Sequence, residues 1–436
     1  MGFYCDIIVA VMAVIHVEQS EPLKGSVQIS GSKNAVLPLL AATLLTDEPC
    51  VLGGVPVLKD VDVMCRLLAH FGASIEKDAG ADQIRVHARE LKTNIAPPEL
   101  VKAMRASIVA MGPLLARTGS AGVPLPGGCA IGDRPIDLHK KGFRSLGAYV
   151  ETRSDESNGG FVTAEAERLR GAEMYLDNAS VGATENIMMA ATLAEGASII
   201  ENAAQEPEIV DLANFLNKMG ARIRGAGTDM IRIEGVRKLH GAEHSVIPDR
   251  IEAGTFMLAA AITGGSVLIE NMLPNHVVPI IAKLRETGVY VREEFGGLKV
   301  DATRGRLRAT DIKTLPYPGF PTDIQPQFMA YLATVEGAST VIETVFENRF
   351  MHIKELNRMH ARISEDGRRA SLPGGAALKG AEVRATDLRA GAALVLAGLA
   401  AEGRTTVSDI HHIDRGYEDF TGKLKRIGAS VWRSDL

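Results

Sequence analysis

The amino-acid sequence predicts an α/β protein of two similar domains, in which small outer sheets surround buried helices. The chain has 436 residues, more than a single hydrophobic core usually serves. Two kinds of helical segment, each followed by a short apolar strand, alternate along nearly the whole sequence. One kind is apolar nearly all round, which is typical of helices buried on every side. The alternative is an ordinary doubly wound α/β protein with accidental similarity between its segments.

The first recurring element is an amphipathic helix that ends in glycine and continues as a strand. Its clear copies begin at residues 60, 135, 207, 276 and 417. In the first copy, Val61, Met64 and Leu68 share one helix face. Gly72 then supplies the C-terminal stop. A further copy over 350–364 lacks this glycine, which leaves the course of the chain there open.

The second recurring element is an alanine-rich helix followed by glycine and a β-branched strand. Its copies begin at residues 33, 104, 180, 250, 322 and 386. Together the two elements make six helix–strand–helix–strand units. Three units per domain would place the alanine-rich helices at the centre and the sheets outside.

Composition limits the classes of partner. Lys and Arg total 48 against 53 Asp and Glu, a net charge of −5, so we expect no general attraction to nucleic acid or to acidic membranes. An anionic ligand therefore needs a local cluster of cations. The four cysteines, at positions 5, 50, 65 and 129, are too scattered for a disulfide framework, which favours a cytoplasmic protein.

The N-terminal residues 1–11 are expected to be an extension or a misassigned start, before a first strand that begins at Met12. The stretch is apolar, which leaves a secretion signal as the alternative. However, it has no basic region, contains Asp6 and is too short to span a bilayer.

Several motifs of cofactor and metal chemistry are missing from the sequence. There is no G-x-x-x-x-G-K-[ST] loop, and Met230 follows Gly225 and Gly227 where a dinucleotide fold needs glycine. There is no H-E-x-x-H and no Cys-x-x-Cys. Adjacent residues of a regular strand point to opposite faces, so His411 and His412 cannot bind one metal from a strand. We therefore expect neither a metal nor a cofactor.

One cysteine lies in an unusual setting, within "LPGGCAIGDRPIDLH" at 125–139. Buried structural cysteines prefer apolar walls. Here Gly127 and Gly128 precede Cys129, and a charged segment with Pro135 follows it. The pattern predicts an exposed loop that carries a reactive thiol.

Charged and polar residues occupy the starts of the alanine-rich helices and the segment ends around them. They are Lys33, Asn34, Arg105, Ser180, Arg250, Asp323, Asp387 and Arg389, together with Arg134, Arg349 and Arg415. Any one of these charges alone is more simply a surface salt bridge. Equivalent ends of repeated units converge on one side, however, and an arginine-rich cluster suits a substrate with both phosphate and carboxylate, such as phosphoenolpyruvate. The turn at Ser180, with Asn178 before it, can either hold a nucleotide-sugar diphosphate or serve as an ordinary helix cap.

These motifs together resemble a known family. The stretches "GSKNA", "PGGCAIGDRPIDLH", "SVGAT", "AAQEPEIVD", "PDRIEAGTF", "FPTDIQPQF", "ETVFENRFMH", "ATDLRA" and "HIDRGYE" are similar to motifs of the UDP-N-acetylglucosamine 1-carboxyvinyltransferases. The resemblance extends from about Val17 to the C-terminus. Its most specific part is the cysteine loop, because the enolpyruvyl-shikimate-phosphate synthases share the sixfold fold without that loop.

The resemblance implies a two-domain inside-out α/β barrel with the active site between the domains. One domain would comprise 33–247 and the other 12–32 with 248–436. The implied reaction transfers the enolpyruvyl group of phosphoenolpyruvate to the 3′-hydroxyl of UDP-N-acetylglucosamine and releases phosphate, the committed step of peptidoglycan synthesis. The antibiotic fosfomycin is the implied inhibitor, and no nucleic acid or membrane partner is expected.

The resemblance also implies residue roles. Cys129 matches the general acid, and Asp323 matches the residue that contacts the acceptor hydroxyl. The matched catalytic residues also include Lys33 and Arg415. The implied phosphoenolpyruvate ligands are Lys33, Asn34, Arg134, Arg349, Arg389 and Arg415. The implied nucleotide-sugar ligands are Arg105, Arg134, Pro135, Ile136, Asp137, Leu138, Asn178, Ala179, Ser180, Val181, Asp323 and Val345.

The sequence departs from the family pattern at three places. Val109 replaces an aromatic residue of some members and Asn178 replaces a basic one, which predicts weaker substrate binding. The segment near His360 lacks the Gly-Ala pair. Two other functions stay open: a 3-phosphoshikimate 1-carboxyvinyltransferase, which would leave Cys129 unexplained, and a non-catalytic nucleotide-sugar-binding copy. The oligomeric state also stays open.

Overall fold

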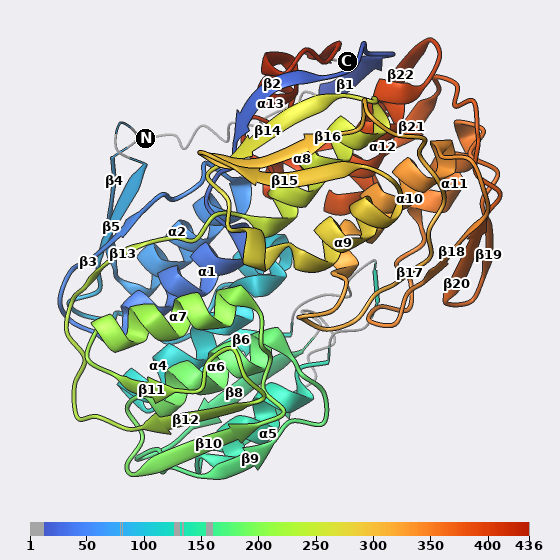
Figure 1. Cartoon of the computed structure of the whole chain (residues 1–436). Coiled ribbons are helices and arrows are strands. Elements are labelled where there is room, and N and C mark those ends of the chain that lie inside the picture. Colours follow the sequence, from blue (N-terminus) through green and yellow to red (C-terminus); the bar gives the residue numbers. More distant parts are fainter. Residues whose placement is uncertain are drawn as a thin grey trace.

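The computed structural model describes residues 13–78, 80, 82–125, 131–132, 135–153 and 160–435. The predicted extension over 1–11, Cys129 and Arg134 lie outside these residues. The described chain forms two lobes (Figure 1). The lower lobe has its own hydrophobic core, which runs from Ala35 to Val246. The core of the upper lobe combines 15–29 with 251–431. On this division we propose one domain over 33–247 and another over 12–32 with 248–436.

Alanine-rich helices fill the centre of each lobe. In the lower lobe they are α1 (Lys33–Ala42) with η1 (Thr43–Leu45), η2 (Arg105–Ala110) with α4 (Met111–Thr118), and α6 (Val181–Ala191). In the upper lobe they are α8 (Arg250–Ile262), η4 (Thr322–Ile324) with α10 (Gln325–Thr334), and α12 (Leu388–Ala400). Nearly all their side chains are buried, which confirms the prediction drawn from their composition.

A second set of helices has one buried and one exposed face. These are α2 (Lys59–Phe71), α5 (Asp137–Ser145), α7 (Pro207–Lys218), α9 (Val278–Glu286), α11 (His352–Arg358) and α13 (Phe420–Arg426). They correspond to the predicted amphipathic copies. The remaining helical segments are α3 (Pro98–Ala103), η3 (Pro274–His276) and η5 (Ile410–Arg415). His411 and His412 lie in η5, so the assumption that they lie on a strand is wrong; His412 N donates to Asp409 O at 3.1 Å, which closes a helical turn there instead.

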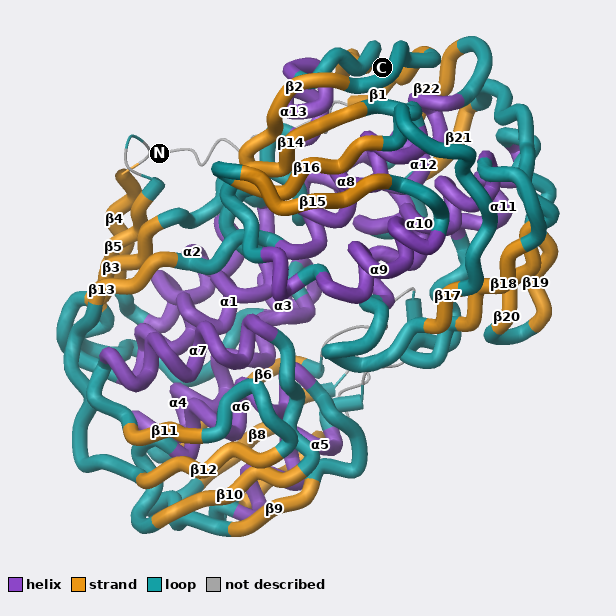
Figure 2. Tube along the Cα trace, viewed as in Figure 1, coloured by secondary structure: helices purple, strands orange, loops and turns teal. Residues whose placement is uncertain are grey.

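The described strands form six small sheets at the outside of the lobes (Figure 2). In the lower lobe the sheets contain β13 (Glu243–Ser245), β3 (Cys50–Gly53), β5 (Gln83–His87) and β4 (Ser74–Asp78); β6 (Ser120–Pro124), β8 (Phe161–Glu165) and β7 (Tyr149–Arg153); and β11 (Arg222–Arg224), β12 (Met230–Glu234), β10 (Ala197–Glu201) and β9 (Glu173–Tyr175).

The upper lobe contains the other three sheets. They are β15 (Tyr290–Glu294), β16 (Gly297–Asp301), β14 (Ser266–Glu270) and β2 (Lys24–Gln28); β17 (Ile312–Lys313), β18 (Ser339–Ile342), β20 (Arg369–Leu372) and β19 (Ser364–Asp366); and β21 (Glu382–Arg384), β22 (Arg404–Ser408), β1 (Ala13–Glu18) and β23 (Val431–Asp435). Strand β1 lies where the sequence predicts the first strand.

The pairing order is the same in all five four-stranded sheets of the described chain. From one edge, the first pair is parallel and the next two are antiparallel. In the three-stranded sheet, a single parallel bridge between Ile95 and Gly122 lies where the first pair would be. The helices inside and the sheets outside match the predicted inside-out arrangement, whereas the equivalence of six sequence repeats stays a prediction.

The segment near His360 follows the same course as the other copies. At the end of α2, Gly72 has φ of +112° and its N–H donates to Ala69 O at 3.0 Å. His360 takes φ of +70°, and its N–H donates to Asn357 O at 3.0 Å. A non-glycine residue therefore adopts the left-handed conformation that normally favours glycine. The open question left by the missing Gly-Ala pair is answered by backbone geometry.

Two chain crossings join the lobes side by side. Ser32 N donates to Ile247 O at 2.7 Å, and Asp249 N donates to Ser30 O at 2.9 Å. Gly31 lies at this crossing, and a Cβ there would be only 2.0 Å from Gly54 O, so a larger residue does not fit. The paired crossings hold the starts of α1 and α8 next to each other.

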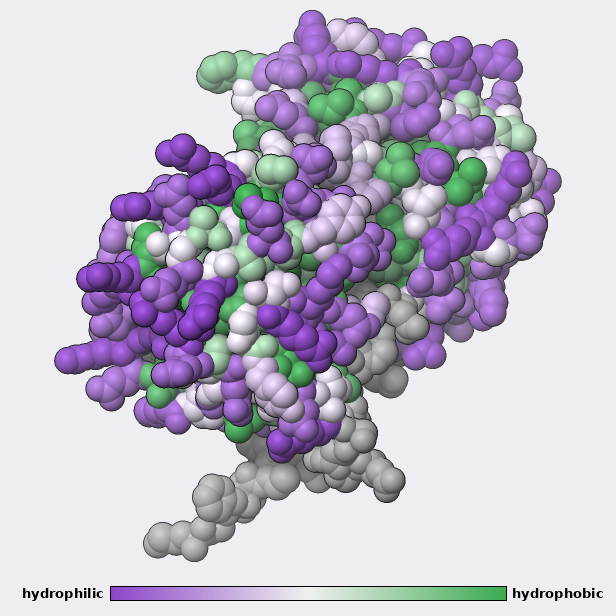
Figure 3. Space-filling model, turned by 90° about the horizontal axis from the view of Figure 1, so that it is seen from below, coloured by the Kyte–Doolittle hydropathy of each residue, from purple (hydrophilic) through white to green (hydrophobic). Residues whose placement is uncertain are grey.

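The face of the molecule drawn in Figure 3 is mainly hydrophilic. On the face that Figure 3 views from below, the coloured hydrophobic residues form small groups between hydrophilic ones. None of the helices that the structure describes combines the length and apolar character needed to cross a membrane.

Candidate active site

The starts of the central helices carry the polar residues that the sequence singles out. Ser180 Oγ accepts from Ala183 N at 3.4 Å, so Ser180 is a helix cap. Asp387 Oδ1 accepts from Arg389 N at 2.8 Å at the start of α12. Asp249 caps α8, accepting from Ile251 N at 2.7 Å, and also accepts from the Lys33 backbone N–H at 3.1 Å. One carboxylate thus joins the first turns of α1 and α8.

Asp60 holds two of the predicted cations together. Its Oδ2 lies 2.9 Å from Lys33 Nζ, and its Oδ1 lies 2.8 Å from Arg415 Nε. Lys33 and Asp60 belong to the lower lobe, whereas Arg415 belongs to the upper lobe. The Asp60 side chain is only 3% exposed. This buried carboxylate therefore bridges the two lobes through predicted site residues.

The charges in this group shift one another's ionisation. Burial alone would raise the pKa of Asp60, but the charges and hydrogen bonds of Lys33 and Arg415 outweigh it and hold the pKa below its ordinary value. Burial lowers the pKa of Lys33, and Arg389 and Arg415 lower it further against the opposing effect of Asp60. Asp60 is the charge that helps Lys33 keep its proton.

Asp323 holds a second pair of cations. Arg349 Nη2 donates to Oδ1 at 3.0 Å, and Arg389 donates to Oδ2 from Nε at 3.2 Å and from Nη2 at 3.1 Å. Both arginine side chains are almost fully buried. Arg349 Nε and Arg389 Nη1 have no hydrogen-bond partner in the described structure. The buried arginines thus keep donors that Asp323 does not use.

A further ion pair crosses the lobes beside this cluster. Arg250 Nε lies 3.0 Å from Glu208 Oε1, and both side chains are nearly buried. Asp323 also acts electrostatically on Arg250. The predicted cations at the starts of α1, α8 and α12 therefore gather in one region between the lobes.

The candidates for nucleotide-sugar binding lie mostly on three segments of the lower lobe. Arg105 begins η2, Pro135 and Ile136 precede α5, Asp137 and Leu138 form its first turn, and Asn178, Ala179, Ser180 and Val181 lie at the start of α6. Helix α6 packs against both η2 and α5. Asp137 forms an ion pair with Lys140 at 2.6 Å on the exposed side.

Val345 belongs to the upper lobe and follows β18; its N–H donates to Glu343 Oε1 at 2.8 Å. Near it, Asn348 N donates to Ile131 O at 3.1 Å. Ile131 belongs to the lower lobe, so the two lobes are in contact at this point. Asn34 is the second residue of α1. No role for these residues follows from position alone.

Sequence reasoning missed Asp60 and Glu208. Asp60 lies on the stripe of buried positions of α2, in line with Met64 and Phe71, and Glu208 is equally buried on α7. A carboxylate on the buried face of an amphipathic helix is a signal, because unpaired charges are rarely buried. The partners, however, are far away in the sequence and cannot be read from the helix.

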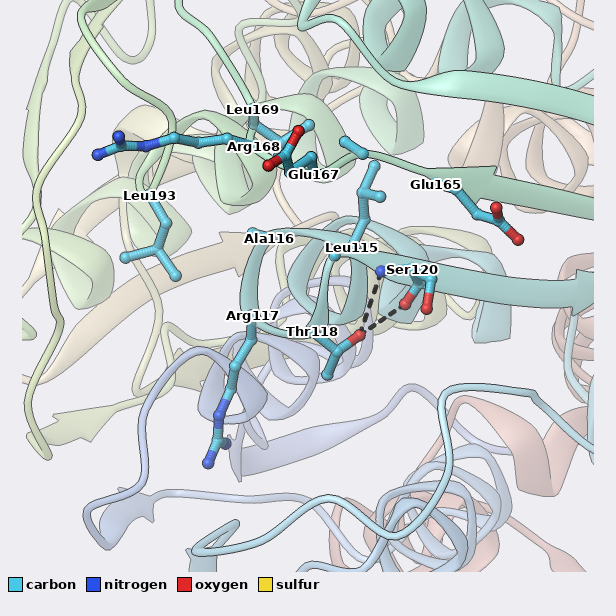
Figure 4. Close-up of a pocket in the computed structure, with 12 residues that line it drawn as sticks. Leu115, Ala116, Arg117, Thr118, Ser120, Glu165, Glu167, Arg168, Leu169 and Leu193 are labelled. Atoms are coloured by element: carbon cyan, nitrogen blue, oxygen red, sulfur yellow. Dashed lines mark hydrogen bonds between the residues drawn. The ribbon is translucent and has the colours of Figure 1, made fainter.

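The hollow in Figure 4 is not this site. It is lined by the end of α4, the start of β6, the 165–169 segment and Leu193, and contains none of the predicted site residues. There Thr118 Oγ1 donates to Ser120 O at 2.7 Å. The hollow lies at the C-terminal end of a central helix, whereas the cations gather at the N-terminal ends, where helix dipoles favour anions.

No metal centre is evident in the described residues, because no three His, Cys, Asp or Glu side chains there are arranged to hold an ion.

The family profile and the curated relatives that match this chain are all described as carboxyvinyltransferases. A family profile described as EPSP synthase (3-phosphoshikimate 1-carboxyvinyltransferase) matches residues 17–424. UDP-N-acetylglucosamine 1-carboxyvinyltransferase 1 of Caldanaerobacter subterraneus is 60% identical over 96% of this chain and 98% of its own. The protein named UDP-N-acetylglucosamine 1-carboxyvinyltransferase in Finegoldia magna is 53% identical over 98% and 100%.

Solved structures show the same fold at lower identity. The enolpyruvyl transferase NikO from Streptomyces tendae superposes with a TM-score of 0.87 at 24% identity, covering 98% of this chain and 99% of that one. EPSP synthase from Acinetobacter baumannii superposes with a TM-score of 0.74 at 20% identity, covering 97% and 100%. The two-lobed arrangement is thus shared with enolpyruvyl transferases.

Proposed function

This chain belongs to the UDP-N-acetylglucosamine 1-carboxyvinyltransferase family, and we propose that it transfers the enolpyruvyl group of phosphoenolpyruvate to the 3′-hydroxyl of UDP-N-acetylglucosamine. The observation that carries the proposal for the site is the gathering of Lys33, Arg415, Arg349 and Arg389 around two carboxylates between the lobes. The product is a peptidoglycan precursor, and the cytoplasm is the proposed location.

The reaction adds and then removes one proton. The acceptor hydroxyl loses its proton as its oxygen bonds to C2 of phosphoenolpyruvate, while C3 gains a proton and the double bond becomes single. Loss of phosphate from C2 and of a proton from C3 then restores the double bond. Catalysis therefore needs a base at the hydroxyl, an acid near C3 and cations at the phosphate.

We assign these roles to residues of this chain. Asp323 is the base at the hydroxyl, because its carboxylate accepts hydrogen bonds and its side chain is 26% exposed, unlike that of Asp60. Lys33 and Arg415, with Arg134, hold the phosphate that leaves. Arg349 and Arg389 hold the substrate carboxylate through the donors that Asp323 does not use. Cys129 supplies the proton for C3, since a thiol with an ordinary pKa is mostly protonated at neutral pH.

The nucleotide sugar is assigned to the lower-lobe segments. Arg105, the 135–138 segment and the start of α6 lie on elements of the lower lobe that pack against one another, and the first-turn N–H groups of α6 suit a diphosphate. Asn178 stands where some relatives carry a basic residue, so we propose weaker binding of UDP-N-acetylglucosamine than in those relatives. Val109 is buried in η2 and contributes to the core.

The test is phosphate release from phosphoenolpyruvate with UDP-N-acetylglucosamine, with shikimate 3-phosphate as the parallel acceptor. Release only with the nucleotide sugar supports the proposal. Release only with shikimate 3-phosphate replaces it with the shikimate reaction. Release with neither acceptor, from protein that binds the nucleotide sugar, identifies a non-catalytic copy.

Fosfomycin provides a prediction about the thiol. The sulfur of Cys129 attacks an epoxide carbon, the carbon–oxygen bond opens and the oxygen takes a proton, so intact-mass analysis is expected to show a single adduct. The Cys129→Asp variant is expected to keep part of the turnover and to escape the drug, because a carboxylic acid can donate a proton but is a poor nucleophile for the epoxide. An unmodified, fully active wild-type protein after incubation would contradict this prediction.

A further inference from the structure

A buried amide lies at the junction of the three lower-lobe segments assigned to the nucleotide sugar. Asn186 is on α6 and is fully buried. Its Oδ1 accepts from Gly112 N at 2.6 Å. Its Nδ2 donates to Ile108 O at 2.8 Å and forms a second hydrogen bond with His139 Nδ1 at 3.0 Å. A polar group inside an apolar helix costs stability unless its bonds are made, and here both donors are used.

The contacts of Asn186 reach each of the assigned segments. Ile108 and Gly112 belong to the helical run that begins at Arg105. His139 directly follows the 135–138 segment, and Asn186 itself is on the helix that begins at Val181. One side chain therefore fixes the relative positions of three segments that approach from different parts of the sequence.

The hydrogen bonds also decide where the His139 proton lies. Gly112 N–H must donate and Ile108 O must accept, which sets the orientation of the Asn186 amide. The remaining amide hydrogen then points at His139 Nδ1, so Nδ1 accepts and the proton is on Nε2. Burial lowers the pKa of His139 to about 4, with a smaller contribution from the charge of Arg105, so the ring is neutral at pH 7.

The Nε2–H group of His139 faces the start of α6. A Cβ built on Gly182 would lie 3.5 Å from Nε2, so the ring edge is next to the first turn of that helix. No hydrogen bond to Nε2 is found within the part of the chain that the structure describes. The ring thus keeps a donor beside the N–H groups that suit a diphosphate.

We propose that Asn186 is a positioning residue for the nucleotide sugar: it joins the three binding segments and holds His139 as the Nε2–H tautomer beside the start of α6. This inference rests on the proposed function and adds to it, because the described hydrogen bonds of Asn186 join Gly112, Ile108 and His139, none of which is a predicted ligand-binding residue. It acts through His139 and through the backbone of η2 and α4.

The first experiment compares Asn186→Asp with the unchanged protein. The new carboxylate still accepts from Gly112 but donates neither to Ile108 O nor to His139. We expect the KM for UDP-N-acetylglucosamine to rise about tenfold, because the hydrogen bonds that join the binding segments are lost, with kcat and the KM for phosphoenolpyruvate within about twofold. An unchanged KM for the nucleotide sugar overturns the inference.

Thr192→Val is the matched control. Thr192 is also fully buried near the end of α6, but its Oγ1 donates only to Met189 O at 2.7 Å on the same helix. This variant loses a buried polar group without touching the three segments, so its KM values are expected to stay unchanged. An equal rise of KM in both variants would mean that helix stability is responsible, and would overturn the inference.

The second experiment needs no variant with a buried charge. Nitrogen-15 spectra of histidine-labelled, unchanged protein are expected to show His139 neutral, with its proton on Nε2, from pH 6 to 8; His139→Gln identifies the signal. A proton on Nδ1, or titration in this range, overturns the inference.

A measurement of UDP binding distinguishes a failure of this inference from a failure of the proposed reaction. If the unchanged protein binds UDP but releases no phosphate, and Asn186→Asp binds UDP about tenfold more weakly, the proposed function fails while the inference holds. Equal binding of UDP by both proteins overturns the inference whatever the activity.

Discussion

Asp60 and Asp323 each hold two cations, but the cations come from different places. Both described ion-pair partners of Asp323 belong to the upper lobe, so these two ion pairs need no contact between the lobes. Asp60 holds Lys33 from its own lobe and Arg415 from the other. The Asp60 group therefore exists only while the lobes are close. Similar local chemistry thus gives one preformed group and one that depends on domain closure.

The largest expected effect comes from the preformed group. Asp323→Ala removes the base and leaves Arg349 and Arg389 without their shared carboxylate. We expect kcat, measured by phosphate release, to fall by roughly 10² to 10⁴. The radius of gyration of the free protein, measured by X-ray scattering, is expected to stay unchanged because both described ion-pair partners of Asp323 belong to the upper lobe. A loss of kcat below about tenfold would contradict the assignment of Asp323 as base.

The Asp60→Asn variant tests the cross-lobe group. Breaking a buried ion pair costs roughly 3 to 5 kcal/mol, and we expect the free energy of unfolding to fall by about this amount and the radius of gyration to rise. Burial and the charges of Arg389 and Arg415 lower the pKa of Lys33. In the variant the negative charge of Asp60 no longer opposes these effects, so the pKa of Lys33 falls further.

The same variant has a pH signature. Lys33 is charged below its pKa and neutral above it, so activity that needs the charge is present at low pH and lost as pH rises through the pKa of the folded protein. The fall of kcat/KM on the alkaline side is therefore expected at lower pH in Asp60→Asn than in the unchanged protein. An unchanged profile would show that Asp60 does not support the charge of Lys33.

The smallest effect is expected at Lys59, the residue that precedes Asp60 in the sequence. Lys59 Nζ lies 3.3 Å from Asp414 Oδ2, again across the lobes, but the lysine side chain is 56% exposed. Exposed ion pairs contribute about 0 to 1 kcal/mol, so Lys59→Ala is expected to leave kcat within about twofold and to change neither scattering nor the pH profile. A scattering change as large as that of Asp60→Asn would mean that burial does not distinguish the two pairs.

Local patterns in the sequence predict most of the fold. The copies that begin at residues 33, 250 and 386 correspond to α1, α8 and α12, because an apolar, alanine-rich stretch has one favourable environment. Ser180 caps α6 as its residue type predicts. The left-handed turn at His360 is not predicted, because neighbouring hydrogen bonds there impose a conformation that the residue itself disfavours.

The candidate site is predicted less completely. Cations such as Lys33 and Arg389 are visible at helix starts, but the buried carboxylate of Asp60 is explained only once the fold brings Lys33 and Arg415 to it, and Arg415 is 355 residues away. Likewise, the sequence shows Asn186 only as one polar residue in an apolar helix. Its hydrogen-bond partners Ile108, Gly112 and His139 are brought to it by the fold. Residue types show which groups can bind, whereas the fold decides which groups meet.

Strand β1 has a consequence for synthesis on the ribosome. It pairs with β22 and β23, so His16 can pair with Thr406 and Trp432 only after those residues have been synthesised. At about 5 to 20 residues per second, the intervening chain takes roughly 20 to 80 seconds to make. All segments of the lower-lobe core emerge within that time, so this lobe can fold co-translationally while the apolar first strand stays unpaired. Nascent chains of this protein therefore expose an aggregation-prone strand that a chaperone would need to shield.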